Sequence, residues 1–171
     1  MPNVYQGSPA AATVRLAIVV SRFNESITRR LLDGAVETLL ARGVPDDAID
    51  VAWVPGAFEI PTVAARMARG GRYAAVICLG AVIRGETTHD QHINRAVSLA
   101  LARLGMETGL PVLFGVLTCN SVEQAVARSG GSMPTTGKDV AAKKIGNKGI
   151  DCAEAALEMI DLLARLDRTT P

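Results

Sequence analysis

The sequence predicts a single α/β domain in which a four-stranded parallel sheet lies between two layers of helices, a three-layer α/β/α sandwich. Short apolar runs of strand length alternate along the chain with longer segments of helical periodicity. Strands that alternate with helices form a parallel sheet covered on both faces. The length of 171 residues fits one domain, and no shift in composition marks a second one.

The first strand and helix follow a loose N-terminal arm. Residues 1–13 are rich in Pro, Gly, Ser and Ala without periodicity, which predicts an arm that orders only against a neighbouring subunit. The domain itself is expected over residues 14–167, with a short tail at residues 168–171. The run VRLAIVV predicts a buried strand at residues 14–20. Apolar residues at helical spacing predict a helix at residues 25–42.

The same alternation continues to the C-terminus. Gly70 and Gly71 end the second helix, and Gly109 and Pro111 precede the fourth strand. The remaining expected strands lie at residues 49–54, 73–79 and 112–117, the helices at residues 57–69, 89–104, 121–129 and 150–166, and a glycine-containing loop at residues 80–88.

Charge and hydropathy narrow the classes of function. The 18 Lys and Arg residues nearly balance the 17 Asp and Glu residues, which leaves a net charge of +1. This balance disfavours a nucleic-acid binder and a disordered acidic chain. Hydrophobic residues make up 49% of the chain but aromatic residues only 4%, so small aliphatic side chains dominate. We expect other copies to cover part of this apolar surface in a homo-oligomer.

The cysteines and the N-terminal sequence indicate the compartment. Cys78, Cys119 and Cys152 are odd in number and far apart, so neither a disulfide framework nor a metal site is expected. The N-terminus lacks a basic region followed by an apolar stretch, and no apolar run approaches the roughly 20 residues that span a bilayer. We therefore expect a soluble, cytoplasmic protein without membrane contact.

Polar or aromatic residues follow the carboxyl ends of all four predicted strands. Ligands bind at this edge of an open parallel sheet. A bare turn needs only Gly, Pro, Asn or Asp, so the additional side chains mark a candidate site. The four loops are residues 21–25, 55–59, 80–89 and 118–121.

The third of these loops carries the clearest chemistry. Residues 85–88, GETT, precede a helix, and backbone N–H groups, hydroxyls and the helix dipole there favour a phosphate. A helix-capping sequence is the alternative. His89 has a side chain suited to proton transfer near neutral pH, although a histidine at a helix start is more often structural or solvated. His92 shares its face, but the pair lacks a third metal ligand.

Three further features each have two interpretations. The ring of Phe23 either stacks on a planar heterocycle or covers the core. Arg128 ends a short helix, where a cation either complements the helix dipole or clamps a phosphate. A cluster of lysines is typical of a solvated face, and the small net charge argues against nucleic acid. This cluster comprises Lys138, Lys143, Lys144 and Lys148.

Five motifs in one order connect the chain to a known family. They are SRFN at residues 21–24, VPGAFEIP at 54–61, GAVIRG at 80–85 followed by Thr88 and His89, FGVLT at 114–118, and GNKG at 146–149. Together they resemble the lumazine synthase family, from about Val14 to Leu166. The resemblance is specific because all five motifs occur in the family's order.

The resemblance implies a flavodoxin-like fold and a transferase of the penultimate step in riboflavin biosynthesis. In that step 5-amino-6-(D-ribitylamino)uracil and 3,4-dihydroxy-2-butanone 4-phosphate condense to 6,7-dimethyl-8-ribityllumazine, phosphate and water. No cofactor and no metal are implied. The implied partners are these two small molecules, other copies of the chain, and riboflavin synthase as a pathway neighbour.

The resemblance also implies a role for individual residues. His89 is the implied proton-transfer residue. Phe114 is expected from the neighbouring subunit and Lys148 close to the ring, which places the active site between subunits. The other implied binding residues are Phe23 on the pyrimidine ring, Ala57, Phe58 and Glu59 on the ribityl chain, the backbone of Ala81, Val82 and Ile83 on the ring edge, and Glu86, Thr87 and Arg128 on the phosphate.

Two features depart from the family pattern. Asp90 follows His89 where many members have an aromatic residue, which alters the polarity beside the proton-transfer residue. The segment at residues 129–145 is longer than in members that form closed icosahedral shells. We expect extra residues at this helix junction to interfere with contacts between pentamers, so a free pentamer or a pair of pentamers is favoured over an icosahedral capsid.

Two other classes of protein compete with the enzyme. A non-catalytic flavin or lumazine carrier would keep the ring pocket, but it would not require Thr87, His89 and Arg128 together. A flavodoxin-like nucleotide-binding protein is disfavoured because neither GxGxxG nor GxxxxGK[ST] follows the first strand.

Overall fold

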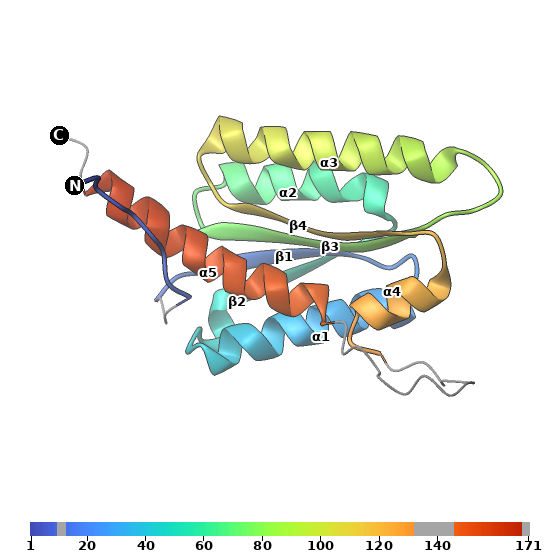
Figure 1. The fold of residues 1–171 in the computed structure, drawn as a ribbon, viewed down its shortest axis with the longest axis horizontal. Coiled ribbons are helices and arrows are strands. Elements are labelled where there is room, and N and C mark those ends of the chain that lie inside the picture. The colour runs from blue at the N-terminus through green and yellow to red at the C-terminus, as the bar shows by residue number, and fades with distance from the viewer. Residues whose placement is uncertain (10–12, 132–145, 169–171) are drawn as a thin grey trace.

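The computed structural model describes residues 1–9, 13–131 and 146–168. Its centre is one parallel sheet with the strand order β2-β1-β3-β4 (Figure 1). The inner strands β1 and β3 are buried almost throughout, because helices cover both faces of the sheet. The strands are β1 (Leu16–Ser21), β2 (Ile49–Val54), β3 (Ala75–Ile83) and β4 (Val112–Cys119).

Helices form a layer on each face of this sheet (Figure 1). One layer holds α1 (Glu25–Ala41), α4 (Val122–Arg128) and α5 (Lys148–Asp167), and the other holds α2 (Ile60–Arg69) and α3 (His89–Thr108). Two short 3-10 turns, η1 (Asp46–Ala48) and η2 (Ala57–Glu59), flank β2. α3 ends at Gly109, whose φ of 66° is a conformation that glycine adopts without steric cost.

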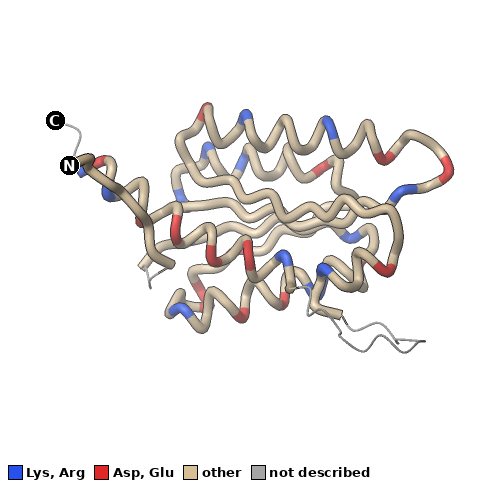
Figure 2. Tube along the Cα trace, viewed as in Figure 1, with Lys and Arg blue, Asp and Glu red and all other residues tan. Residues whose placement is uncertain are grey.

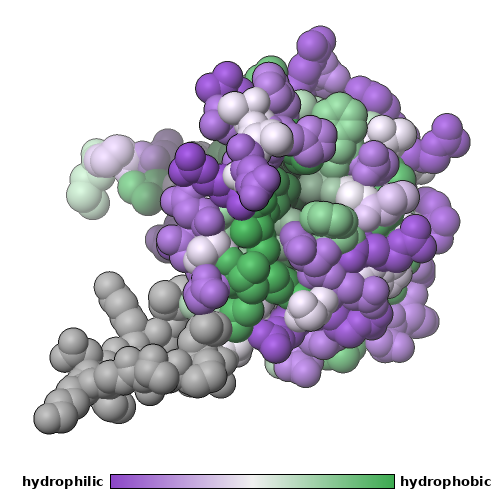
Figure 3. Space-filling view, turned by 90° about the vertical axis from the view of Figure 1, so that its right-hand side faces the viewer, coloured by the Kyte–Doolittle hydropathy of each residue, from purple (hydrophilic) through white to green (hydrophobic). Residues whose placement is uncertain are grey.

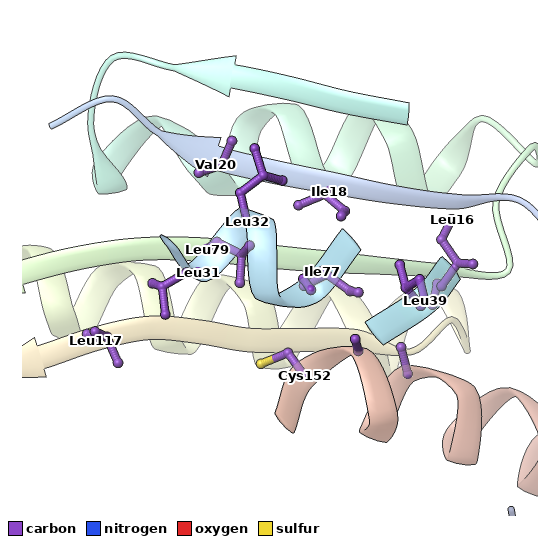
Figure 4. Packing of buried hydrophobic residues seen from close by; sticks show 14 of the residues in the cluster. Leu16, Ile18, Val20, Leu31, Leu32, Leu39, Ile77, Leu79, Leu117 and Cys152 are labelled. Carbon is purple, nitrogen blue, oxygen red and sulfur yellow. The ribbon is translucent and has the colours of Figure 1, made fainter. Parts of the chain in front are cut away.

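The core is divided by the sheet into two hydrophobic clusters, because successive side chains of a strand point to opposite faces. Ile18 and Ile77 pack with Leu31 in the cluster under α1 and α5 (Figure 4). Val19 packs with Leu101 in the cluster under α2 and α3. Burial of each such aliphatic side chain contributes about 1.5–3 kcal/mol, so both helix layers are held to the sheet mainly by these contacts.

The predicted fold class is confirmed, and the flavodoxin-like strand order is that of the structure. The second strand has the predicted bounds, whereas the third, predicted at residues 73–79, runs from Ala75 to Ile83. The loop predicted at residues 80–88 is wrong over residues 80–83, because the pairs Gly80↔Val116 to Ile83↔Cys119 continue the β3–β4 ladder. The helix predicted at residues 57–69 begins as the separate turn η2.

The N-terminal residues lie beside the end of α5 (Figure 1), where the Ser8 amide donates a hydrogen bond to Asp161 Oδ2 at 2.9 Å. Residues 1–9 contain no helix or strand. Acidic and basic positions are interspersed over both helix layers (Figure 2). Within the described ranges, none of the helices combines the length and apolar character of a transmembrane segment.

Candidate active site

The sheet places the candidate site at its carboxyl edge, beside β1. α1 follows β1 on one face, and α2 follows β2 on the other, so the winding of the chain reverses between β1 and β3 (Figure 1). Ligand sites in open α/β sheets form at such a reversal, because the loops that leave the strands diverge there. A cavity of about 510 Å³ lies at this position.

Three of the four predicted loops and the end of β3 line this cavity. Figure 3, which looks onto this end of the molecule, shows a hydrophobic strip between hydrophilic residues. In the sequence, Glu86 lies between the lining residues Gly85 and Thr87. The loop at residues 118–121 contributes no lining residue. The predicted site residues in the lining are Phe23, Ala57, Phe58, Glu59, Ala81, Val82, Ile83, Thr87 and His89, and Pro55, Gly56, Gly85, Asp90 and Ile93 complete it.

Two phenylalanine rings stand at the cavity without being part of the core. The exposed fractions are 70% for Phe23 and 59% for Phe58. The Phe23 loop is fixed to the loop after β2, because the amides of Arg22 and Phe23 donate to the carbonyls of Val54 (2.8 Å) and Pro55 (3.0 Å). Of its two predicted interpretations, the exposure of Phe23 excludes a cover over the core and leaves a ring free to stack.

The backbone of β3 has a free edge at the cavity. β1 pairs with β3 only as far as Val20↔Leu79, whereas β3 continues to Ile83 and is paired there with β4 alone. Backbone groups of alternate residues point to the same side of a strand. Ala81 and Ile83 therefore direct their N–H and C=O groups past the end of β1. Such an edge can hydrogen-bond a planar ring as it would a further strand.

Asn24, to which the sequence motifs assign no individual role, connects this free edge to the Phe23 loop. Its Nδ2 donates to the Ala81 carbonyl at 2.9 Å, and its own carbonyl accepts from the amides of Ile27 and Thr28 as α1 begins. Its φ of 61° is left-handed, which asparagine tolerates better than most residues. An asparagine directly before a predicted helix was the signal for this role.

His89 is the first residue of α3 and is exposed at the cavity. The Thr88 side chain makes no capping hydrogen bond, and Thr87 Oγ1 accepts only a long one from the His89 amide, at 3.4 Å. The GETT loop therefore caps α3 weakly, which leaves its amides and hydroxyls available to an anion. Asp90 Oδ1 is buried and has no hydrogen-bond partner among the described residues.

Phe114, Arg128 and Lys148 do not reach this cavity in the single chain. Phe114 pairs with Cys78, three positions before the pair Ala81↔Leu117, which is about 10 Å along the strand at about 3.3 Å per residue. Arg128 ends α4 and Lys148 begins α5, both in the layer with α1, whereas η2 and α3 at the cavity lie on the other face.

Two predictions concern residues beyond this site. Lys138, Lys143 and Lys144 lie outside the described residues. Residues 132–145, which make up most of the segment at 129–145 that favours a pentamer or a pair of pentamers, lie outside them as well. Cys78, Cys119 and Cys152 are unpaired and buried, and burial raises the pKa of each thiol. In the described part of the chain, no group of three or more His, Cys, Asp or Glu side chains is arranged to hold a metal ion.

A comparison with protein families agrees with the motifs and the geometry. The family model for 6,7-dimethyl-8-ribityllumazine synthase matches residues 13–164, which include all strands, all helices except the last residues of α5, and the whole cavity. Because the match covers nearly the whole chain, the family assignment applies to the entire domain and not to one motif. The chain therefore belongs to the lumazine synthase family, whose members are transferases of riboflavin biosynthesis.

Proposed function

We propose that this chain condenses 5-amino-6-(D-ribitylamino)uracil with 3,4-dihydroxy-2-butanone 4-phosphate to form 6,7-dimethyl-8-ribityllumazine. One observation carries the proposal. A single cavity at the winding reversal brings together an exposed aromatic ring at Phe23, the free backbone edge of β3, and His89 at the start of α3.

Each part of the cavity matches a part of the two substrates. A pyrimidine ring presents a flat face to Phe23 and an edge of donors and acceptors to the Ala81 amide and the Ile83 backbone, since the Ala81 carbonyl already accepts from Asn24. The ribityl hydroxyls are assigned to the η2 loop, where Glu59 supplies acceptors. The phosphate is assigned to the weakly capped start of α3 with Glu86 and Thr87, where backbone amides supply the donors.

The proposed reaction forms two bonds to the uracil. Its 5-amino nitrogen attacks the ketone carbon, and loss of water gives an imine. Loss of a proton from the neighbouring hydroxyl-bearing carbon expels the phosphate and leaves an enol, which tautomerises to a ketone at that carbon. The ribitylamino nitrogen attacks this carbonyl and closes the ring with loss of a second water. Orientation of two reactants can contribute about 7–11 kcal/mol. We assign to His89 the proton transfers, typically worth about 10²–10⁴-fold.

We further propose that a neighbouring copy supplies Phe114, Arg128 and Lys148 to the cavity. All three lie away from the cavity of their own chain, and the Phe114 ring is 39% exposed on the edge strand β4. A ring of copies would place this edge against the next cavity. We assign the assembly as a pentamer or a pair of pentamers.

The test follows lumazine formation by absorbance and fluorescence when purified protein meets both substrates, against the same mixture without protein. Acceleration that falls on replacement of His89 or Arg128 supports the proposal. A folded chain that binds riboflavin without accelerating the condensation would instead be a ring-binding carrier.

A further inference from the structure

The side-chain amide of Asn147 joins three helices on the face of the sheet that holds α1. Its Nδ2 donates to the carbonyl oxygens of Arg30 in α1, at 2.8 Å, and of Ser129 directly after α4, at 3.1 Å. Its Oδ1 accepts a hydrogen bond from the Gly149 amide at 2.8 Å and so caps α5. Both amide protons and the amide oxygen are thus used at once.

Glycines surround this amide and fit the three helices to it. A Cβ atom at Gly34 of α1 or at Gly130 would press against the Asn147 amide. A Cβ atom at Gly149 would overlap the carbonyl oxygen of Leu31 in α1. The close approach of α1 and α5 is therefore built around an asparagine of this size.

The same residue lies at a junction that carries two cations. Ser129 and Asn147 form an isolated antiparallel bridge, in which opposed Cα atoms lie about 4.5–5.5 Å apart. Arg128 is the residue before Ser129 and Lys148 is the residue after Asn147, so the two residues adjoin the same end of this antiparallel bridge. Lys148 Nζ lies 3.7 Å from Asp151 Oδ2, whereas no carboxylate of the described residues pairs with Arg128.

We propose that Asn147 is a positioning residue that holds Arg128 and Lys148 at a fixed separation for the substrate in the cavity of the neighbouring copy. This inference rests on the proposed function, which assigns both cations to that substrate. Like charges repel, so their separation is set by the backbone bridge and the amide rather than by mutual attraction. A displacement of about 1 Å in such a group can cost about 10²-fold in rate.

Substitution by serine separates positioning from helix capping. In Asn147→Ser the hydroxyl still accepts from the Gly149 amide, but both donations to the carbonyls of Arg30 and Ser129 are lost. We expect the KM for the butanone phosphate to rise about tenfold, because a charged contact to phosphate is weakened. The KM for the uracil should rise less than that for the phosphate substrate, because Phe23 and the β3 edge bind its ring in addition to Lys148.

Two further variants control for loss of stability. Asn147→Ala removes the cap as well, so its KM for the phosphate substrate should match that of Asn147→Ser while its Tm is lower. Leu157→Ala loosens the buried packing of α5 without touching the bridge, and should lower Tm with both KM values unchanged. A wild-type KM in Asn147→Ser, or the same KM change in Leu157→Ala, would overturn the positioning role.

A distance measurement tests the same link without any activity. Spin labels at Arg128→Cys and Lys148→Cys report the separation of the two positions, in chains diluted with unlabelled copies so that only distances within one chain contribute. We expect a narrow distribution with Asn147 and a broad one in Asn147→Ser. Equal widths overturn the inference. A broadened distribution in Asn147→Ser, together with an unlabelled wild-type chain that performs no condensation, would support the bridge and refute the proposed function.

Discussion

Replacement of Phe23 by alanine separates ligand binding from folding. The ring is 70% exposed in the free chain, so its removal leaves no internal cavity and uncovers no core residue. We therefore expect the free energy of unfolding to change by no more than about 0.5 kcal/mol, as for other surface substitutions. For a domain of this length that corresponds to a Tm shift of about 1–2 °C.

The effect on ring binding should be much larger. Stacking of a nucleobase on an aromatic side chain contributes about 1–3 kcal/mol, and each 1.4 kcal/mol is about a factor of ten in Kd. Riboflavin has the same kind of planar, ribityl-bearing ring system as the proposed product. Its Kd should accordingly rise by roughly 5- to 150-fold in Phe23→Ala and stay near the wild-type value in Phe23→Trp, which keeps a flat aromatic face.

Quenching of riboflavin fluorescence on titration with protein gives the Kd, and thermal unfolding of the same samples gives the Tm. Leu40→Ala is the matched control, because Leu40 is also a partly exposed apolar residue (41%) but lies in α1 away from the cavity. An unchanged Kd in Phe23→Ala would refute the stacking role. A loss of more than about 1 kcal/mol of stability would show instead that the ring belongs to the core.

Three other substitutions and one chemical modification have expected outcomes. In steady-state assays His89→Ala should be slower by at most about 10²–10⁴-fold yet still faster than the uncatalysed reaction, because orientation of the substrates remains. Arg128→Ala should mainly raise the KM for the phosphate substrate. A wild-type rate in His89→Ala, or a wild-type KM for the phosphate substrate in Arg128→Ala, would remove the corresponding role. Gly149→Ala should lower the free energy of unfolding in urea by about 3 kcal/mol or more, because its Cβ overlaps the Leu31 carbonyl oxygen, and a wild-type midpoint would contradict that packing. Burial raises the pKa of Cys152 to about 11, so at pH 8 about one thiol in a thousand is the reactive thiolate, and a disulfide reagent should modify it only after unfolding.

The elements of the fold could be predicted because each depends on a local pattern. The apolar run at β1 and the helical spacing in α1 are complete within single segments of the chain, and the predicted fold class followed from their alternation. The end of β3 is different. Residues 80–83 have the composition of a short loop or of a strand, and hydrogen bonds to β4 decide between them. A partner more than 30 residues away leaves no sign in the local sequence.

The site depends on just such a non-local relation. The free backbone edge at Ala81 and Ile83 exists because β1 ends at Ser21 while its neighbour β3 runs on, so it is a property of two strands and not of either motif. Asn24 and Asn147 show the same principle in side chains. Each precedes a helix, where a sequence predicts at most a cap, yet each donates its amide protons to carbonyls of distant segments. An asparagine that supplied only a cap could be exchanged for serine or aspartate, whereas one that joins distant carbonyls cannot. The tolerance of these two positions to serine is therefore a direct measure of how far the site is held together by contacts that no local pattern contains.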